Sequence, residues 1–236
     1  MHTPFQIAID GPSAAGKGTV SRLVAEKLGF LYVDTGAMYR VAGLILLESG
    51  IDPTDEDALV EKLTAAQIEM RNPTDNEKDG RLTTVLLDGR DVSWDIRKEQ
   101  VSMLASKVAQ FSQVRKVLVE KQQAIAATQN VVMEGRDITY RVLPHAQLKV
   151  FLTGGDVVRA KRRHLQLQSR GEPISFETVY SQVKERDTED TTRAVDPLKK
   201  IPEAWEVDTS DLRIGQVVDL LVYKAQVLMN YEQRDS

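Results

Sequence analysis

The residues best suited to chemistry in this 236-residue chain form the stretch GPSAAGKGT at positions 11–19. Four residues separate Gly11 from Gly16, and Lys17 follows directly. Glycines at this spacing let backbone N–H groups converge on an anion, and the lysine brings positive charge to phosphate oxygens. Because the stretch joins an apolar run to a helical pattern, the helix N-terminus adds its dipole. A phosphate-binding loop is therefore predicted, with a plain glycine turn as the alternative.

The hydroxyl residue of this loop stands one position later than usual. The common pattern has Ser or Thr directly after the lysine, whereas here Gly18 intervenes and Thr19 carries the hydroxyl. The GKGT form resembles small phosphoryl-transfer kinases, nucleoside monophosphate kinases in particular. A GTPase is disfavoured because no Asn-Lys-x-Asp motif is present. The expected ATP-binding residues of the loop are Gly11, Pro12, Ser13, Ala14, Ala15, Gly16, Lys17, Gly18 and Thr19.

Several arginines are candidates for neutralising an acceptor that carries its own phosphate. Arginine stays charged and binds phosphate oxygens through a bidentate fork. The stretch DTGAMYR places Thr35 and Arg40 at the start of a helix. The stretch EGRD ends a predicted strand and puts Arg136 and Asp137 at the crevice where open α/β sheets bind ligands.

A further charged stretch, KERDTEDTTR, spans positions 184–193. Arg186, Asp190 and Arg193 share one face if the helix runs that far, and a solvated face with i,i+4 ion pairs is the alternative. The DGRD at 88–91 lies between two strand-like runs, so it is interpreted as a hairpin turn and not as a second site.

A basic helical pattern, RAKRRHLQLQSRG, leads into a glycine-containing loop. Such a segment fits a mobile lid that closes over a triphosphate and excludes water. An RNA-binding patch is the alternative, but aromatic residues are not interleaved and the chain's net charge is −4. The arginines that could reach the triphosphate are Arg159, Arg162, Arg163 and Arg170.

Composition excludes several other kinds of chemistry. The chain has no cysteine, so disulfides and thiol chemistry are excluded, and its three histidines make no metal-ligand pattern. No apolar run approaches the ~20 residues that span a bilayer, and no signal-peptide pattern is present. A cytoplasmic monomer without membrane or nucleic-acid partners is expected.

The element pattern predicts a doubly wound α/β fold. Short apolar runs predict buried parallel strands at 5–10, 30–34, 130–134, 148–152 and 204–208. Helical patterns lie between them at 17–28, within 96–128, and at 157–169, 176–190 and 212–231, with Asp156 and Ser175 as expected N-caps. This alternation indicates a parallel sheet with helices on both faces. The region 66–94 breaks the rhythm, because QIEMR, TTVLLD and DVSW alternate with turn signals and indicate a small antiparallel insert.

Nearly the whole chain resembles the bacterial-type cytidylate kinases. The resemblance rests on IDGPSAAGKGT, DTGAMYR, DVSWDIRKEQVSMLASKVAQFSQVR, GRD, RAKRRHLQLQ and KERDTEDTTRAVDPL. It implies transfer of the γ-phosphoryl group of MgATP to CMP or dCMP. It also implies one P-loop kinase domain over 1–236, with a five-stranded core at 1–35, 116–158 and 190–236, an acceptor-binding part with a three-stranded antiparallel insert at about 36–115, and a helical lid at about 159–189.

The resemblance implies roles for particular side chains. Arg186 matches a residue that contacts the acceptor and the transferring phosphate, and it is expected to act in catalysis with Lys17 and Arg162. Mg²⁺ is expected near Thr19 and Asp34, partly through water. In the acceptor site, Thr35 would contribute a hydroxyl contact, and the phosphate would be bound by Arg40, Arg136 and Arg193. Cytosine would be contacted by Ser106 and Arg115, the pentose would lie near Asp190, and Asp137 and Arg186 would complete the site. The lid arginine Arg159 would belong to the ATP site.

The sequence departs from this family at one strand end. Glu134 replaces the first Asp of the family's DGRD, and Thr139, Tyr140 and Arg141 stand where Gly, Thr and Val are frequent. The departure concerns the path by which the chain leaves the site after Asp137. Two other classes stay open: a P-loop kinase for another small acceptor, and an ATP-hydrolysing switch that needs no acceptor.

Overall fold

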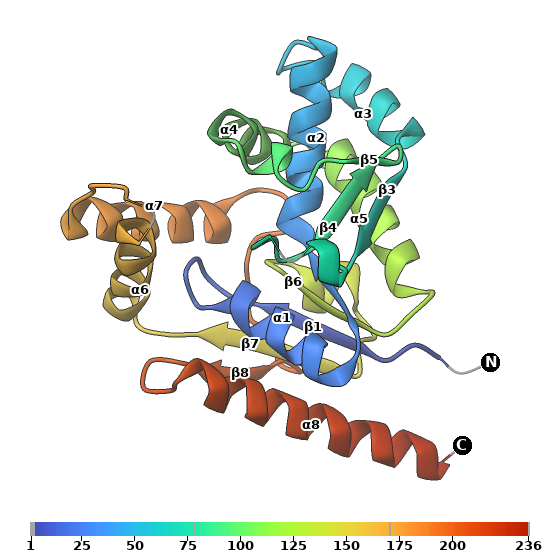
Figure 1. The fold of residues 1–236 in the computed structure, drawn as a ribbon, viewed down its shortest axis with the longest axis vertical. Helices are drawn as coiled ribbons and strands as arrows, with labels where there is room; N and C mark the ends of the chain where they lie inside the picture. The colour runs from blue at the N-terminus through green and yellow to red at the C-terminus, as the bar shows by residue number, and fades with distance from the viewer. Residues whose placement is uncertain (1–2, 78, 170, 236) are drawn as a thin grey trace.

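A five-stranded parallel sheet forms the centre of the molecule (Figure 1). The computed structural model describes residues 3–77, 79–169 and 171–235. The strand order is β2-β6-β1-β7-β8, and every neighbouring pair is parallel. The prediction of five parallel strands is confirmed within one or two residues at each end. The strands are β1 (Gln6–Asp10), β2 (Leu31–Asp34), β6 (Val131–Gly135), β7 (Leu148–Thr153) and β8 (Trp205–Asp208).

Helices cover both faces of this sheet, as the alternating pattern predicts. Ile7 and Ile9 pack with α1 (Lys17–Leu28) and α8 (Ile214–Asp235), whereas Ala8 between them packs with the opposite cluster. That second cluster includes α2 (Thr35–Ser49) and α5 (Ser112–Ala126). Because successive side chains of a strand point to opposite faces, the apolar run of β1 is buried on both sides. None of the helices in the described part of the chain is long and apolar enough to cross a membrane.

The amphipathic stretch predicted within 96–128 is not one helix. It divides into η2 (Asp95–Arg97), α4 (Glu99–Val108) and α5, and the break lets α4 lie across α2 while α5 packs on the sheet. A Cβ on Gly43 of α2 would lie 2.9 Å from the carbonyl oxygen of Val101, so α4 approaches α2 very closely. Helix α3 (Glu56–Ala65) was not predicted.

The antiparallel insert contains the three strands β3 (Ile68–Arg71), β4 (Thr84–Leu87) and β5 (Arg90–Asp91). The short helical turn η1 (Asp75–Glu77) lies between β3 and β4. Asp88 and Gly89 have φ of +50° and +80°, the geometry of a hairpin turn, which confirms the interpretation of DGRD at 88–91. The strand predicted over DVSW is wrong beyond Asp91. The Asp91 carboxylate accepts hydrogen bonds from the Ser93 backbone N–H (2.9 Å) and hydroxyl (2.6 Å), which bends the chain out of the sheet.

Two helices, α6 (Asp156–Gln168) and α7 (Phe176–Thr192), project from one side of the sheet (Figure 1). They share a small apolar core that includes Ala160, Leu167 and Val179. The Ser175 hydroxyl caps α7 by accepting from the Thr178 N–H at 3.2 Å, as predicted. The cap predicted at Asp156 is wrong, because Gly155 precedes the helix and Asp156 is its first residue. We refer to α6 and α7 as the lid; Arg170 lies outside the described residues.

Candidate active site

The loop after β1 has the backbone of an anion-binding turn. Ala14 and Gly16 adopt φ of +57° and +87°, and Gly16 directly precedes α1. A Cβ on Gly11 would lie 2.0 Å from the carbonyl oxygen of Leu152, so only glycine fits there. The Lys17 side chain folds back over the loop, and its Nζ donates to the carbonyl of Pro12 at 2.8 Å. The loop therefore aims the N-terminus of α1 and a lysine at one point.

Lys17 is 5% exposed and lies among charged neighbours. Burial and the nearby Arg136 lower its pKa to about 7, although Glu134, Asp190 and Asp10 act in the opposite direction. A bound polyanion would stabilise the ammonium form and return the pKa toward its ordinary value. The site is thus electrostatically incomplete until an anion occupies it.

A proton uptake follows from this lowered pKa. In the ligand-free protein near pH 8, Lys17 is largely neutral, so binding of a nucleoside triphosphate is expected to take up close to one proton. Near pH 6 the lysine is already charged and the uptake should fall. Calorimetric titration in buffers of different ionisation enthalpy measures it. Equal uptake by the wild type and Lys17→Ala would contradict the assignment.

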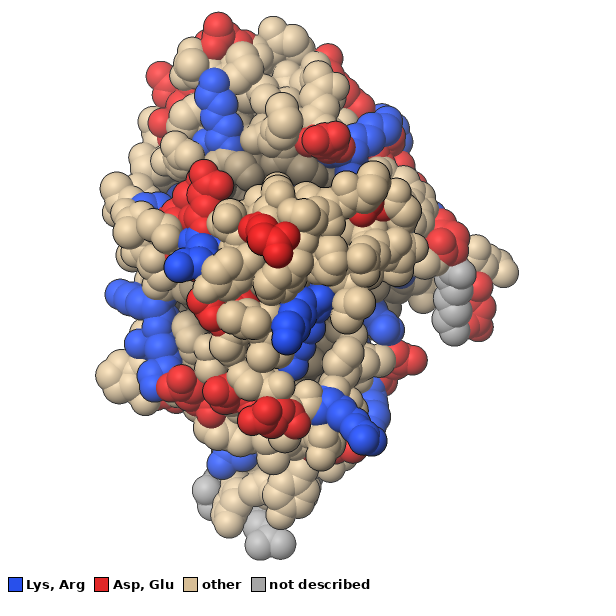
Figure 2. Space-filling model, turned by 90° about the vertical axis from the view of Figure 1, so that its left-hand side faces the viewer, with Lys and Arg blue, Asp and Glu red and all other residues tan. Residues whose placement is uncertain are grey.

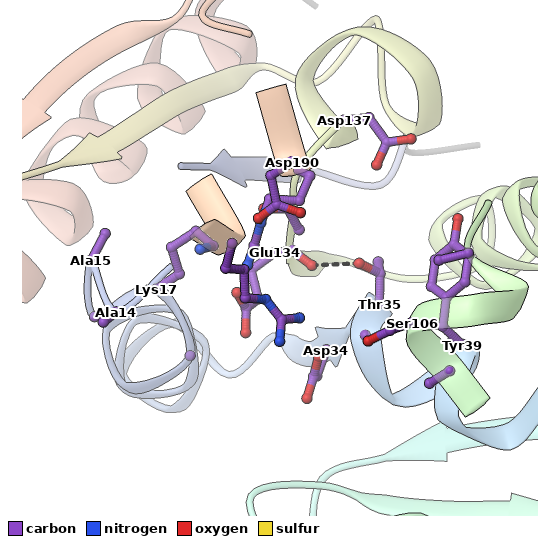
Figure 3. A pocket seen from close by; sticks show the side chains of 18 of the residues that line it. Ala14, Ala15, Lys17, Asp34, Thr35, Tyr39, Ser106, Glu134, Asp137 and Asp190 are labelled. Atoms are coloured by element: carbon purple, nitrogen blue, oxygen red, sulfur yellow. Dashed lines mark hydrogen bonds and ion pairs between the residues drawn. The ribbon is translucent and has the colours of Figure 1, made fainter. Parts of the chain in front are cut away.

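A cavity of about 1440 Å³ opens at the carboxyl ends of the parallel strands, between the loop, α2, α4 and the lid. Figure 3 shows Lys17, Glu134 and Asp190 converging near its centre, with Ser106 and Tyr39 at the α4 side. Open α/β sheets bind ligands at this edge. The site residues predicted from the sequence that line the cavity are Ala14, Ala15, Gly16, Lys17, Gly18, Thr19, Asp34, Thr35, Arg40, Ser106, Arg115, Arg136, Asp137, Arg162, Arg186, Asp190 and Arg193.

Four of the residues predicted to bind ATP do not line this cavity: Gly11, Pro12, Ser13 and Arg159. Arg159 is 6% exposed and donates to the carbonyls of Ser13 (2.9 Å) and Gly154 (2.8 Å). It also pairs with Asp187 of α7 at 2.6 Å, and the other Asp187 oxygen accepts from the Ser13 N–H at 3.1 Å. Here Arg159 ties the lid to the phosphate loop. The sequence prediction did not single out Asp187, although it lies beside Arg186 in the KERD stretch.

The other lid arginines face the cavity. Arg162 donates to the Thr209 hydroxyl at 2.8 Å and to its carbonyl at 2.5 Å, and Arg163 donates to Gln166 at 2.9 Å. Basic and acidic side chains are interspersed on the lid side of the molecule (Figure 2). That face therefore does not present the continuous basic surface typical of RNA binding.

The arginines predicted to bind the acceptor fall into two groups. Arg136 is paired with Asp190 at 2.5 Å, so its guanidinium is already oriented. Among the residues that the structure describes, Arg40 and Arg186 have no hydrogen-bond or ion-pair partner, yet both line the cavity. Burial and the neighbouring Arg136 and Arg40 lower the pKa of Arg186, with Asp190 acting against them. Cations held together with too little counter-charge indicate a site for an anionic ligand.

Arg115 is locked in place under the cavity floor and is 2% exposed. It pairs with Asp137 and, at 3.1 Å, with Asp196, and its guanidinium lies 5.4 Å from the centre of the Tyr39 ring. Burial raises the pKa of Asp137 to about 6, opposed by Arg115 and Arg193. Arg193 is not on the shared helical face considered from the sequence, because α7 ends at Thr192.

Asp10, at the end of β1, is a structural residue that the sequence prediction missed. It is fully buried and accepts hydrogen bonds from the Ile138 N–H (2.9 Å), the Thr139 N–H (2.8 Å) and the Thr139 hydroxyl (2.7 Å). These bonds hold η3 (Ile138–Val142), a single π-helical turn, against the end of β1. The chain therefore leaves the site after Asp137 through this turn. The carboxylate that ends the mostly apolar run FQIAID was the available signal.

Two carboxylates lie side by side at neighbouring strand ends, Asp34 on β2 and Glu134 on β6. The Thr35 hydroxyl donates to the Glu134 carbonyl at 2.7 Å (Figure 3). Burial and the Asp34 charge raise the pKa of Glu134. A Cβ on Gly18 would lie 3.2 Å from a Glu134 carboxylate oxygen and 3.4 Å from the Tyr32 hydroxyl. A side chain at position 18 would therefore require Glu134 to shift by a few tenths of an ångström.

The fold and the site together define the class: the chain is a P-loop kinase, with the loop after β1, several arginines and the two projecting helices around one cavity. The family model described as "Cytidylate kinase" matches residues 7–227. The chain belongs to the cytidylate kinase family.

Three relatives, each named cytidylate kinase, illustrate the match. That of Caldicellulosiruptor bescii is 43% identical over 214 residues, covering 91% of this chain and 92% of the relative. That of Carboxydothermus hydrogenoformans is 44% identical over 218 residues, covering 92% and 96%. That of Bacillus subtilis is 40% identical over 222 residues, covering 94% and 96%. The similarity thus spans both the core and the lid.

Proposed function

We propose that this protein transfers the γ-phosphoryl group of ATP to the 5′-phosphate of CMP or dCMP, giving ADP and CDP or dCDP. The observation that carries the proposal is the gathering of Lys17, Arg40 and Arg186 in one cavity without enough counter-charge. The phosphate loop supplies a place for the donor, and the arginines supply one for a second phosphate. The names of the relatives supply cytosine as the base.

The reaction needs positioning and charge neutralisation, and no covalent intermediate. An oxygen of the acceptor phosphate attacks the γ-phosphorus, and the bond from that phosphorus to the β–γ bridging oxygen breaks. Lys17 and the lid residue Arg162 stabilise the charge on the donor side. Arg136, held by Asp190, orients the acceptor phosphate, and Arg186 neutralises the group in transfer.

The strand ends suit Mg²⁺ bound together with ATP. The carboxylates of Asp34 and Glu134 repel one another, and a cation bound between them and the phosphates would relieve that repulsion. The exposed Thr19 hydroxyl lies in the same cavity. The described residues contain no group of three or more His, Cys, Asp or Glu that could hold a metal alone. That suits Mg²⁺, which keeps several waters and binds through one or two carboxylates plus phosphates. Held beside Asp34, Glu134 and Thr19 together with ATP, it would neutralise phosphate charge during the transfer.

Base recognition is assigned to Ser106 on α4, whose exposed hydroxyl faces the cavity and donates to the Ser102 carbonyl at 3.3 Å. Ser106→Ala is expected to reduce the preference for CMP over UMP, measured as the ratio of kcat/KM values, by about tenfold. Ser112→Ala, which removes an exposed hydroxyl outside the cavity lining, is the control. An unchanged ratio in Ser106→Ala would place base reading elsewhere.

Arg115 remains part of the proposed cytosine site, but its replacement is a poor test. Arg115→Met would leave the buried Asp137 without its main partner, and breaking such a pair costs about 3–5 kcal/mol of the free energy of unfolding. Loss of base preference in that variant would not be separable from loss of the fold.

The function is tested by measuring ADP release from MgATP with CMP, dCMP, UMP, AMP or no acceptor in parallel. Fast release with CMP and dCMP alone supports the proposal. Fast release with a different acceptor would indicate another small-molecule kinase, and equal release without acceptor would indicate an ATP-hydrolysing switch. A cytoplasmic location, a monomeric state and the absence of nucleic-acid and membrane partners belong to the same proposal.

A further inference from the structure

Tyr140 and Arg141, two long side chains of η3, contact the loop that follows the lid. The Tyr140 hydroxyl donates to the Pro197 carbonyl at 2.6 Å. The Lys199 ammonium lies 4.3 Å from the centre of the Tyr140 ring, and Arg141 pairs with Asp196 at 3.8 Å. These contacts join η3 to residues 193–199, which we call the acceptor loop.

The η3 end of this connection is firmly held. Both the backbone and the hydroxyl of Thr139 donate to the fully buried Asp10, which ends the strand before the phosphate loop. Tyr140 and Arg141 therefore extend from a fixed point of the core. A contact made from a rigid turn can hold a loop, whereas a contact between two mobile segments cannot.

The other end lies at Asp196, which fixes two arginines of the acceptor site. Its carboxylate accepts from Arg115 Nε at 3.1 Å, and its backbone carbonyl accepts from Arg193 Nε at 2.7 Å. Asp196 has a φ of +46°, a conformation that non-glycine residues adopt rarely and keep only when their surroundings enforce it. Arg141 contacts Asp196 itself, and Tyr140 contacts the next residue, Pro197.

We infer that Tyr140 and Arg141 are positioning residues for the acceptor nucleotide: they hold the acceptor loop so that Asp196 orients Arg115 and Arg193. The inference rests on the proposed function, because it gives these two arginines the task of binding CMP. It also gives a role to two long polar side chains, which reach the acceptor loop from η3.

The test compares Tyr140→Phe, Arg141→Gln and the double variant with the wild type. Tyr140→Phe removes one hydrogen bond and keeps the ring beneath Lys199, so KM for CMP should rise about three- to tenfold. The double variant should show a larger rise, while kcat and KM for ATP stay within about twofold. Tyr180→Phe loses a comparable bond, to Asp156 at 2.9 Å, inside the lid and should leave KM for CMP unchanged.

Equal increases in KM for CMP and for ATP would overturn the inference, because they would show a general loosening of the structure. Unchanged KM for CMP in both single variants would overturn it as well. Arg141 is half-exposed, so its replacement keeps the test valid even if Tyr140→Phe folds poorly. If wild-type protein showed no CMP-dependent ADP release, the proposed function and the inference would both fall, whereas the outcomes above overturn the inference alone.

Discussion

Lys17→Ala is expected to lower kcat by about 10²–10³-fold at saturating ATP and CMP, as removal of a preorganised donor does in other enzymes. The lysine is 5% exposed, and its Nζ is held 2.8 Å from the Pro12 carbonyl, beside the N-terminus of α1 where the proposed donor would bind. Its ammonium group is therefore in position, and protonated once the triphosphate is bound, before the reaction begins. Steady-state kinetics with both substrates varied give the effect on kcat separately from binding.

Lys27→Ala is the matched control for this variant. Lys27 lies in the last turn of the same helix, and its ammonium pairs with Asp219 of α8 at 2.6 Å on the surface. Its removal should leave kcat unchanged and lower stability by no more than about 1 kcal/mol. Near-normal turnover by Lys17→Ala at saturating substrates would contradict the role given to the lysine.

The central sheet was predictable because its signals are local. The apolar runs of β1, β6 and β7 are long enough to indicate buried parallel strands, and the spacing of Gly11, Gly16 and Lys17 indicates the loop between β1 and α1. The predictions failed where the local structure depends on contacts between residues far apart in the sequence. The helical pattern within 96–128 is broken so that α4 can pack against Gly43, which lies more than fifty residues earlier.

The candidate site shows the same division. Most of the residues chosen for chemistry line one cavity, because strand ends of a parallel sheet meet at one edge. Their partners were not predictable from spacing: Arg136 pairs with Asp190, and Arg115 with Asp196, each across a long stretch of chain. The sequence groups Arg159 with the other lid arginines because they are neighbours in the chain. In the structure, Arg159 is buried and bonded to the Ser13 carbonyl, whereas Arg162, about one turn later in the helix, faces the cavity.

Arg186→Ala is expected to have the second large effect, a decrease of kcat by about 10²–10³-fold. Arg186 sits on α7 beside Arg136 and Arg40, where a second phosphate would supply the missing negative charge. Arg186→Lys should recover part of the loss, since it keeps the charge and lacks the bidentate fork. Lys184→Ala, on the same helix with its ammonium 5.5 Å from the Tyr180 ring centre, is the control and should keep wild-type turnover.

Arg186 separates catalysis from stability better than Arg136 does. Arg136→Ala would leave the Asp190 carboxylate without its partner, so its lower activity would combine lost binding with a weakened fold. Arg186 has no such partner in the described part of the chain, and burial together with the charges of Arg136 and Arg40 lowers its pKa. Arg186→Ala should therefore unfold at the same denaturant concentration as the wild type or a slightly higher one. A variant that keeps both this stability and wild-type kcat would remove Arg186 from the proposed mechanism.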